Sequence, residues 1–209
     1  MKYRLILFDV DSTLIKEEVI DLLATKSGHG KEVARITASA MRGEIEFNQA
    51  LSERISLLEG LPESVFDEVL DQISFSDGFN DLYTYLREND FLIGAISGGF
   101  HNVLDKLFAS IELDFLRANV LEVLEGKLTG RLLSGPVDKV AKGRALKEFA
   151  TAHNVALENT VAVGDGANDI EMIELAGLGV SYMGKEVLRA KADLHLEHPG
   201  LDALIEHLR

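Results

Sequence analysis

The sequence predicts an α/β fold: a Rossmann-like, doubly wound parallel sheet that carries an inserted helical cap and a small β-hairpin. Short apolar runs bounded by Gly, Asp or Ser alternate with stretches of helical periodicity, the pattern of buried parallel strands joined by crossover helices. After the first run, roughly eighty residues show helical periodicity alone, which is too much for one crossover. A Glu125-Gly126 pair lies between two further short runs and is typical of a hairpin turn.

The strands and helices of the sheet domain follow from these patterns in chain order. The expected strands are Tyr3–Phe8, Phe91–Ile96, Thr160–Val163 and Leu178–Tyr182. The expected crossover helices are Phe79–Glu88, Asn102–Ile111, Val140–Ala152 and Ile170–Ala176. An amphipathic helix over Leu201–Leu208 is expected to close one face of the sheet.

The helical insertion and the hairpin complete the predicted organisation. Helical segments of the insertion are expected at Glu17–Ser27, Lys31–Arg42, Phe47–Leu58 and Pro62–Ile73. The hairpin strands are expected at Asn119–Val123 and Lys127–Leu132. We therefore expect a cap domain at residues 15–76, inserted into a core domain made of residues 1–14 and 77–209.

Composition and charge exclude several classes of protein. The 209 residues include 21 Lys and Arg against 35 Asp and Glu, a net charge of −14, and no Cys. Without Cys there is no disulfide, no thiolate metal site and no cysteine nucleophile, so a metal would be held by oxygen or imidazole. The acidic balance and the absence of a Lys/Arg stripe argue against nucleic acid as a partner.

The apolar segments also bear on where the protein works. The run Leu5–Phe8 is too short for the core of a signal peptide, and no other run could span a bilayer. The expectation is a cytoplasmic protein without a membrane partner, either a monomer or a homodimer.

Two carboxylates follow the first predicted strand, at Asp9 and Asp11. The carboxyl edge of a parallel sheet is where open α/β proteins bind ligands. Because side chains alternate in an extended segment, both acids would point to the same side and repel each other. This repulsion would raise the pKa of one of them unless Mg²⁺ or a shared proton relieves it, so the pair indicates a metal site or an acid/base role. Taken alone, the pair is equally compatible with an acidic turn.

A second acidic cluster, at Asp165 and Asp169 with Asn168 beside them, follows the strand at Thr160–Val163. Carboxylates from two strand ends would then converge on one crevice, which is costly to fold without a divalent cation. Mg²⁺, which binds one or two carboxylates together with water and phosphate oxygens, satisfies such a site better than Ca²⁺, because the ligands are split between distant strands.

Two further features indicate a bound anion. The strand at Phe91–Ile96 runs into Ser97-Gly98-Gly99, which offers a hydroxyl and unhindered backbone N–H groups before a helix. Lys142 lies near the start of a predicted helix, where a cation opposes the helix dipole and a phosphate partner would explain its presence. A plain Ser-Gly turn and a solvated lysine are the alternatives for each feature taken alone.

In these motifs the chain resembles the haloacid dehalogenase-like phosphohydrolases over its whole length. The ordered motifs are Asp9-Val10-Asp11-Ser12-Thr13, Ser97-Gly98-Gly99, Lys142 and Gly164-Asp165-Gly166-Ala167-Asn168-Asp169. Their forms are those favoured by the members that hydrolyse phosphoserine. The resemblance therefore implies hydrolysis of O-phospho-L-serine to L-serine and phosphate, the last step of serine biosynthesis.

The resemblance also implies roles for individual residues. Asp9 would be the nucleophile that forms an aspartyl-phosphate, and Asp11 the acid and then the base. Mg²⁺ would be held by the Asp9 carboxylate, the Asp11 backbone carbonyl and Asp165. Residues that would contact the phosphoryl group or the rest of the substrate are Ser97, the Gly98 amide, Lys142 and Asn168. Asp169 would orient Lys142 or the water molecules around the metal.

Substrate choice is expected to depend on the cap. By resemblance, Glu18 would receive the substrate ammonium and Arg54 its carboxylate, which suits the bidentate geometry of Arg. On the residues alone, each is also compatible with a solvated helix charge. Met41 and Phe47 are expected to line the apolar side of the cap or to pack in its core.

Two alternatives remain open from the sequence. A signalling receiver domain also combines paired acids, a Ser or Thr and a Lys around Mg²⁺, but it is shorter, lacks a cap and has its acids in another order. Within the same superfamily, the chain could be another small-molecule phosphomonoesterase or a phosphotransferase that uses phosphoserine. Catalytic release of phosphate would distinguish a phosphatase from a receiver domain. Product analysis would distinguish hydrolysis from phosphotransfer.

Overall fold

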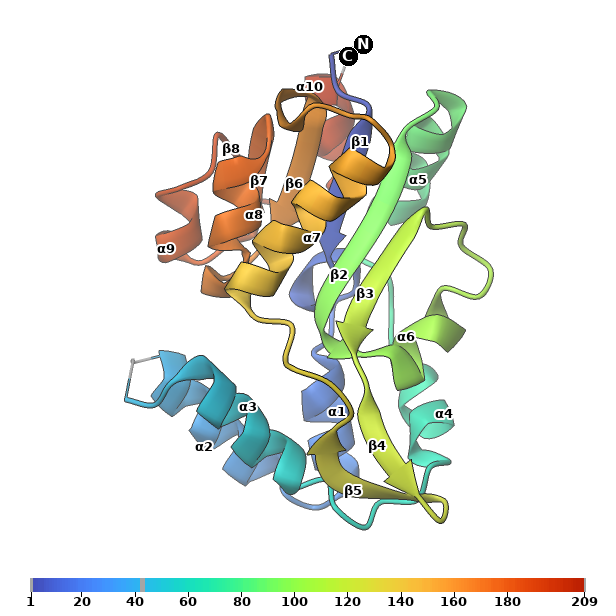
Figure 1. The fold of residues 1–209 in the computed structure, drawn as a ribbon, viewed down its shortest axis with the longest axis vertical. Helices are drawn as coiled ribbons and strands as arrows, with labels where there is room; N and C mark the ends of the chain where they lie inside the picture. The colour runs from blue at the N-terminus through green and yellow to red at the C-terminus, as the bar shows by residue number, and fades with distance from the viewer. Residues whose placement is uncertain (1, 42–43, 209) are drawn as a thin grey trace.

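In the computed structural model, which describes residues 2–41 and 44–208, six strands form one parallel sheet in the order β3-β2-β1-β6-β7-β8 (Figure 1). The strands are β1 (Leu5–Asp9), β2 (Leu92–Phe100), β3 (Phe115–Asn119), β6 (Thr160–Gly164), β7 (Leu178–Tyr182) and β8 (Leu194–Leu196). The strand order reverses direction beside the central β1, which is the topology of a doubly wound sheet. The predicted fold class is confirmed.

The register brings the carboxyl ends of the three central strands together. Asp9, the last residue of β1, is opposite Ile96 of β2, and Phe8 is opposite Val163 of β6. The residues that follow Ile96 and Val163 therefore lie beside Asp9 at one edge of the sheet. This edge contains all of the motifs expected at strand ends.

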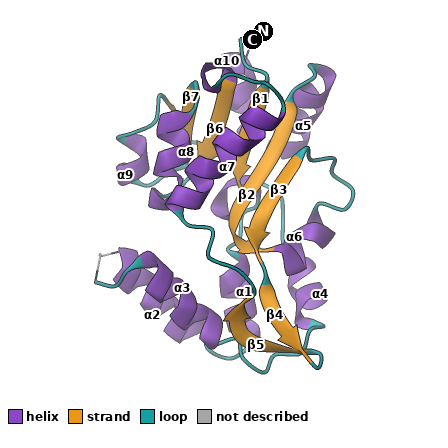
Figure 2. Cartoon of the chain, viewed as in Figure 1, coloured by secondary structure: helices purple, strands orange, loops and turns teal. Residues whose placement is uncertain are grey.

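Helices cover both faces of the sheet, as Figure 2 shows by secondary structure. One face packs against α7 (Lys139–Ala152), α8 (Ile170–Leu175) and α9 (Glu186–Arg189), and the other against α5 (Phe79–Glu88), α6 (His101–Leu107) and α10 (Ile205–Leu208). Along β1, Leu5 and Leu7 belong to the apolar cluster of α7, whereas Ile6 and Phe8 belong to the opposite one. The side-chain period of two therefore directs Asp9 to the side of α7.

The insertion between β1 and β2 is helical, as predicted. It contains α1 (Val19–Lys26), α2 (Gly30–Met41), α3 (Phe47–Ser56) and α4 (Val65–Leu70), and the predicted end of α2 at Arg42 lies outside the described residues. The two linkers of the insertion run antiparallel, with Ile15 paired to Phe75. The Ser76 hydroxyl also donates to the Thr13 carbonyl at 2.6 Å. The division at residues 15–76 stays a prediction.

The predicted hairpin is present and packs on the insertion. It consists of β4 (Leu121–Leu124) and β5 (Lys127–Leu132), and Glu125 and Gly126 have φ of 51° and 74°. Such a turn, with two positive φ angles, matches the twist of the strands. The hairpin bonds to the connection between α3 and α4, because Gly60 N donates to Leu128 O at 2.8 Å and Leu128 N to Leu61 O at 2.9 Å.

Three details differ from the sequence prediction. The strands β3 and β8 were not expected, and β2 extends through Phe100 instead of ending at Ile96. The segment Leu201–Leu208 forms a 3₁₀ turn followed by the short α10, although it does close one face of the sheet with buried Leu201, Leu204 and Leu208. Among residues 2–41 and 44–208, every helix is too short or too polar to traverse a lipid bilayer.

Candidate active site

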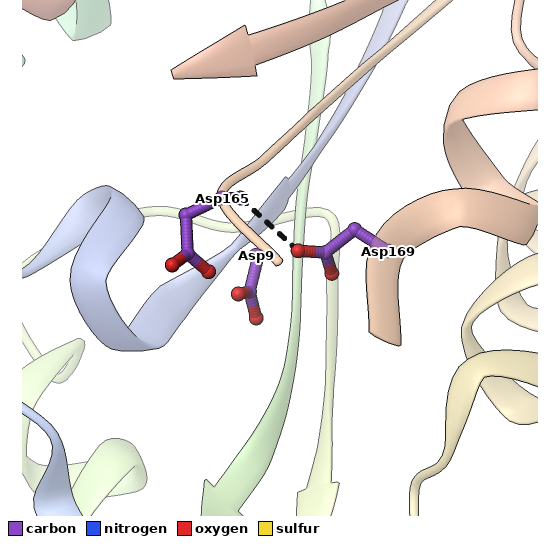
Figure 3. Close-up of side chains that lie close together, drawn as sticks. All are labelled: Asp9, Asp165 and Asp169. Atoms are coloured by element: carbon purple, nitrogen blue, oxygen red, sulfur yellow. Dashed lines mark hydrogen bonds between the residues drawn. The ribbon is translucent and has the colours of Figure 1, made fainter. Parts of the chain in front are cut away.

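The candidate site lies at the carboxyl edge of β1, β2 and β6. Three carboxylates meet there, from Asp9, Asp165 and Asp169, with one oxygen of each within 4.8 Å of the others (Figure 3). Asp9 ends β1, while Asp165 and Asp169 come from the loop after β6. Two residues expected as metal ligands, Asp9 and Asp165, are thus brought together, and Asp169 joins them.

The loop after β6 is held by the Asp169 carboxylate. Its Oδ2 accepts from Asp165 N at 3.1 Å, drawn dashed in Figure 3, and from Gly166 N at 3.0 Å. A Cβ at Gly164 would lie 2.5 Å from the Asp169 carboxyl carbon, so that close approach requires glycine. The loop therefore presents Asp165 to Asp9 with little freedom. Asn168 lies half-buried in the same loop.

Lys142 is completely buried and donates to Asp9 Oδ1 at 2.5 Å and to Asp169 Oδ1 at 2.6 Å. It is therefore not a solvated lysine. Burial alone would lower the pKa of Lys142, but attraction to Asp169 and Asp9 raises it above its ordinary value. The side chain comes from the buried face of α7, whose first turn is capped by Asp138.

The carboxylates carry more negative charge than Lys142 balances. Burial and then repulsion from Asp169 hold the pKa of Asp9 well above its ordinary value, and burial likewise raises the pKa of Asp165. A cation placed among these oxygens would relieve both effects. Clustered carboxylate oxygens are the donors that hard divalent cations prefer, so this set fits a metal ion.

Asp11 has partners different from those of Asp9. Its Oδ1 accepts from Val19 N at 2.8 Å and its Oδ2 from the Ser97 hydroxyl at 2.5 Å. The strand ends at Asp9, and Asp11 lies in the following turn, where Ser12 has a φ of 56°. The premise of one extended segment through both acids is therefore not met, because the strand ends before Asp11, and Asp11 links α1 to β2. Asp11 is still close enough to add to the repulsion that raises the pKa of Asp9.

The Ser97-Gly98-Gly99 segment lies against Asp11. Ser97 Oγ accepts from Gly99 N at 2.6 Å while it donates to Asp11. A Cβ at Gly99 would lie 2.8 Å from Asp11 Oδ2, which explains the glycine. The Ser97 hydroxyl thus lies beside Asp11, and the Gly99 N–H is bonded to that hydroxyl. Anion binding by this segment stays a prediction.

Glu18, the residue before α1, lies within electrostatic reach of Asp11 and Asp165. Its Oε1 accepts from the Ser12 hydroxyl at 2.7 Å. Burial, followed by repulsion from Asp11, raises the pKa of Glu18 to about 7. The group is half-buried, so it is not the solvated helix charge that the sequence alone allowed.

Arg54 lies on α3 of the helical insertion. It is half-buried, and its Nε donates to Ala50 O at 3.3 Å and its Nη1 to Thr37 Oγ1 at 3.4 Å. Burial lowers the pKa of Arg54, whereas attraction to Glu18 and Asp21 opposes the change. The structure therefore places Arg54 and Glu18 within electrostatic reach of each other. The side chains of Met41 and Phe47, which were also predicted in the cap, lie outside the described part.

Two residues of this region were not singled out from the sequence. Lys185 lies with its Nζ 3.3 Å from Asp165 Oδ2, and its backbone N donates to Asp165 O at 2.9 Å. It follows β7, the neighbour of β6, so its place after a strand end was the available signal. The other residue, Asn119, binds the backbone of Gly98 from the end of β3, and that strand was not predicted.

Comparisons with known proteins agree with this geometry. The family model for haloacid dehalogenase-like hydrolases matches residues 6–174. The chain is 45% identical to the phosphoserine phosphatase of Streptococcus thermophilus over 98% of this chain and 95% of that protein. Two solved structures cover all of both chains at 38% identity: a phospho-aspartyl intermediate analogue of phosphoserine phosphatase (TM-score 0.93) and a substrate-bound phosphoserine phosphatase complex (TM-score 0.94).

Proposed function

Because the chain belongs to the haloacid dehalogenase-like hydrolase family, we propose that it is a Mg²⁺-dependent phosphatase that hydrolyses O-phospho-L-serine to L-serine and phosphate. The observation that carries this proposal is the Asp9 carboxylate, which lies among two further carboxylates and against the buried Lys142. The reaction is the last step of serine biosynthesis. We expect it in the cytoplasm, with the enzyme a monomer or a homodimer.

Asp9 is the proposed nucleophile. One of its carboxylate oxygens attacks phosphorus, the bond from phosphorus to the seryl oxygen breaks, and an aspartyl-phosphate forms. The departing oxygen takes a proton from Asp11, so serine leaves as the neutral alcohol. Asp11 then removes a proton from water as the water attacks phosphorus, which releases phosphate and restores the Asp9 carboxylate.

The transferring phosphoryl group needs hydrogen-bond donors. We assign this role to Lys142, the Ser97 hydroxyl, the Gly98 amide and Asn168. Lys142 supports the assignment most directly, because its ammonium donates to Asp9 and is completely buried. Ser97 would have to turn its hydroxyl from Asp11 to the phosphate, which frees the Asp11 carboxyl for proton transfer.

The residues proposed to hold Mg²⁺ are Asp9, Asp165 and the backbone carbonyl of Asp11, with Asp169 orienting Lys142. When bound, the metal supplies positive charge that offsets repulsion between the Asp9 carboxylate and the phosphate. The crowding of Asp9, Asp165 and Asp169 supports this assignment.

Specificity for serine is assigned to the proposed cap at residues 15–76. Glu18 would receive the substrate ammonium, and Arg54 would bind its carboxylate through two parallel hydrogen bonds. The supporting observation is that Glu18 and Arg54 are half-buried side chains of opposite charge that interact electrostatically with each other and with Asp11, an arrangement that suits a zwitterion.

Phosphate release from a panel of phosphomonoesters tests the proposal. With Mg²⁺, phosphoserine should be hydrolysed with a higher kcat/KM than phosphothreonine, phosphoethanolamine or phosphoglycolate. If another ester has the higher kcat/KM, that ester and not phosphoserine is the substrate. Adding an alcohol acceptor and identifying the products distinguishes hydrolysis from phosphotransfer, because transfer would give a new phosphate ester in place of free phosphate.

A further inference from the structure

Asn119 is a completely buried polar residue outside the motifs already discussed. It ends β3, and its Nδ2 donates to the Gly98 carbonyl at 2.7 Å, while its Oδ1 accepts from Val137 N at 2.8 Å. One partner is an acceptor and the other a donor, so the orientation of the amide is fixed. Asn119 thus joins β2 to the segment that leads into α7.

The hydrogen bond from Asn119 to Gly98 is connected to Asp11, the proposed acid/base, through the Gly98-Gly99 peptide group and Ser97. The Gly98 carbonyl and the Gly99 N–H belong to the same planar unit, and the N–H donates to Ser97 Oγ at 2.6 Å. Ser97 in turn donates to Asp11 Oδ2 at 2.5 Å. A continuous series of hydrogen bonds therefore runs from Asn119 to the Asp11 carboxylate.

The Gly98-Gly99 peptide needs such an anchor. Two successive glycines have no Cβ to restrict the backbone on either side of this peptide. Gly99 is packed closely against Asp11 and Ser97, whereas a Cβ at Gly98 would have only the Val137 carbonyl oxygen within 4 Å, at 3.9 Å. The hydrogen bond from Asn119 thus fixes the Gly98 side of this peptide.

The bond to Val137 reaches the proposed phosphate-binding lysine. Val137 precedes Asp138, whose Oδ1 accepts from Ala141 N at 2.9 Å and so begins α7. Lys142 follows in the first turn of that helix, and its N donates to Asp138 O at 2.9 Å. The position of Val137 therefore affects where the Lys142 ammonium is placed.

We propose that Asn119 is a positioning residue for phosphoryl transfer, which holds the Gly98-Gly99 peptide, next to the proposed phosphate-binding amide of Gly98, and the start of α7 in one arrangement. It acts through Gly98 and Val137 without touching the substrate. This inference rests on the proposed function, since it concerns the same site.

A matched residue separates positioning from simple structural support. Asn102 also bonds twice to backbone near the hairpin: its Nδ2 donates to Leu121 O at 3.2 Å, and its Oδ1 accepts from Leu121 N at 2.9 Å. Both of its bonds go to Leu121 of β4, so they do not join β2 to the segment that leads into α7. If Asn119 served only to attach the hairpin, the two asparagines would be equivalent.

The experiment compares Asn119→Ala with Asn102→Ala in the full chain. Binding of inorganic phosphate with Mg²⁺ is measured by calorimetry, kcat and KM for phosphoserine are measured by phosphate release, and Tm by thermal unfolding. Asn119→Ala should weaken phosphate binding about tenfold and lower kcat about a hundredfold, because small displacements of catalytic groups are costly. Asn102→Ala should lower Tm and leave phosphate binding and kcat as in the unmodified chain.

A folded Asn119→Ala protein that binds phosphate and turns over like Asn102→Ala would overturn the proposal. If the Ala variant does not fold, Asn119→Ser replaces it, since one hydroxyl cannot reproduce both bonds; normal phosphate binding by the Ser variant would be equally decisive. An unmodified chain inactive on phosphoserine would refute the proposed function, whereas phosphate binding would still test the role of Asn119.

Discussion

The ammonium of Lys142 lies 2.6 Å from Oδ1 of Asp169, and neither side chain has exposed surface. Such a pair depends on both members, because the removal of one leaves a buried charge without its partner. Asp9 shares the same ammonium, so Lys142 compensates two carboxylates that come from different strand ends.

Lys142→Met should abolish phosphate release and destabilise the metal-free protein by about 3–5 kcal/mol, the usual cost of breaking a buried pair. Urea unfolding in the presence of a chelator measures the second effect. Lys139→Met is the matched control, because Lys139 is an exposed lysine in the same helical turn. Equal stability of the two variants would show that the buried pair contributes nothing.

Asp9→Asn should abolish turnover while the fold is kept, because an amide cannot attack phosphorus. Burial and Asp169 already disfavour the ionised Asp9, as its raised pKa indicates, so a neutral amide should not destabilise the metal-free protein. Phosphate release and thermal unfolding check these outcomes. Beryllium fluoride with Mg²⁺ should bind the unmodified chain and not the variant. Activity above about a hundredth of the original would remove Asp9 as nucleophile.

Arg54→Ala tests whether Arg54 binds the substrate carboxylate. It should lower kcat/KM for phosphoserine by the equivalent of about 2–5 kcal/mol, since a buried charge pair is lost. Phosphoethanolamine lacks the carboxylate, so it should be a poor substrate of the unmodified chain, and its kcat/KM should fall little further in Arg54→Ala. The effects of deleting the substrate carboxylate and of deleting the Arg54 side chain should therefore be strongly non-additive. Arg35→Ala, an exposed arginine of α2, is the control. Equal losses for both esters would make Arg54 a structural residue of the cap.

Glu18→Gln should change how stability depends on pH. The pKa of Glu18 is about 7 in the folded protein against an ordinary value of 4.5, so between these values the folded state binds more protons than the unfolded state. The free energy of unfolding then falls as pH rises through this window, by at most about 3 kcal/mol. In chelator, Glu18→Gln should gain stability relative to the unmodified chain from pH 4.5 to 7. The exposed Glu63→Gln serves as control, and parallel stability curves for Glu18→Gln and the unmodified chain would contradict the buried carboxylate.

The sequence predicted four strands of the sheet and the meeting of their carboxyl ends, because both depend on local pattern. Strands buried on both faces read as apolar runs, and parallel strands bring their carboxyl ends to one edge, so Asp9, Ser97 and Asp165 could be placed together. The hairpin was predictable because Glu125-Gly126 supplies the two positive φ angles of a tight turn.

The missed features depend on contacts distant in sequence. β3 is an edge strand that contains Arg117, and β8 has three residues, so neither shows a clear apolar run. The partners of Asp11 come from α1 and β2, and Lys185 meets Asp165 across two strands. Such pairings follow from tertiary packing, which no local period encodes.

The hairpin is bonded to the Gly60–Glu63 connection, so it constrains how the helical insertion can move relative to the sheet. Rotation of the helical insertion about its two linkers alone would break the backbone bonds to Leu128 and the bond from Glu63 N to Gly126 O. If these hydrogen bonds are kept, the hairpin moves together with the helical insertion. The chain then bends at the base of the hairpin, where Leu133 N donates to Val120 O. Val120 follows Asn119 directly, so such a movement would bend the chain beside the residue that bonds the Gly98 carbonyl.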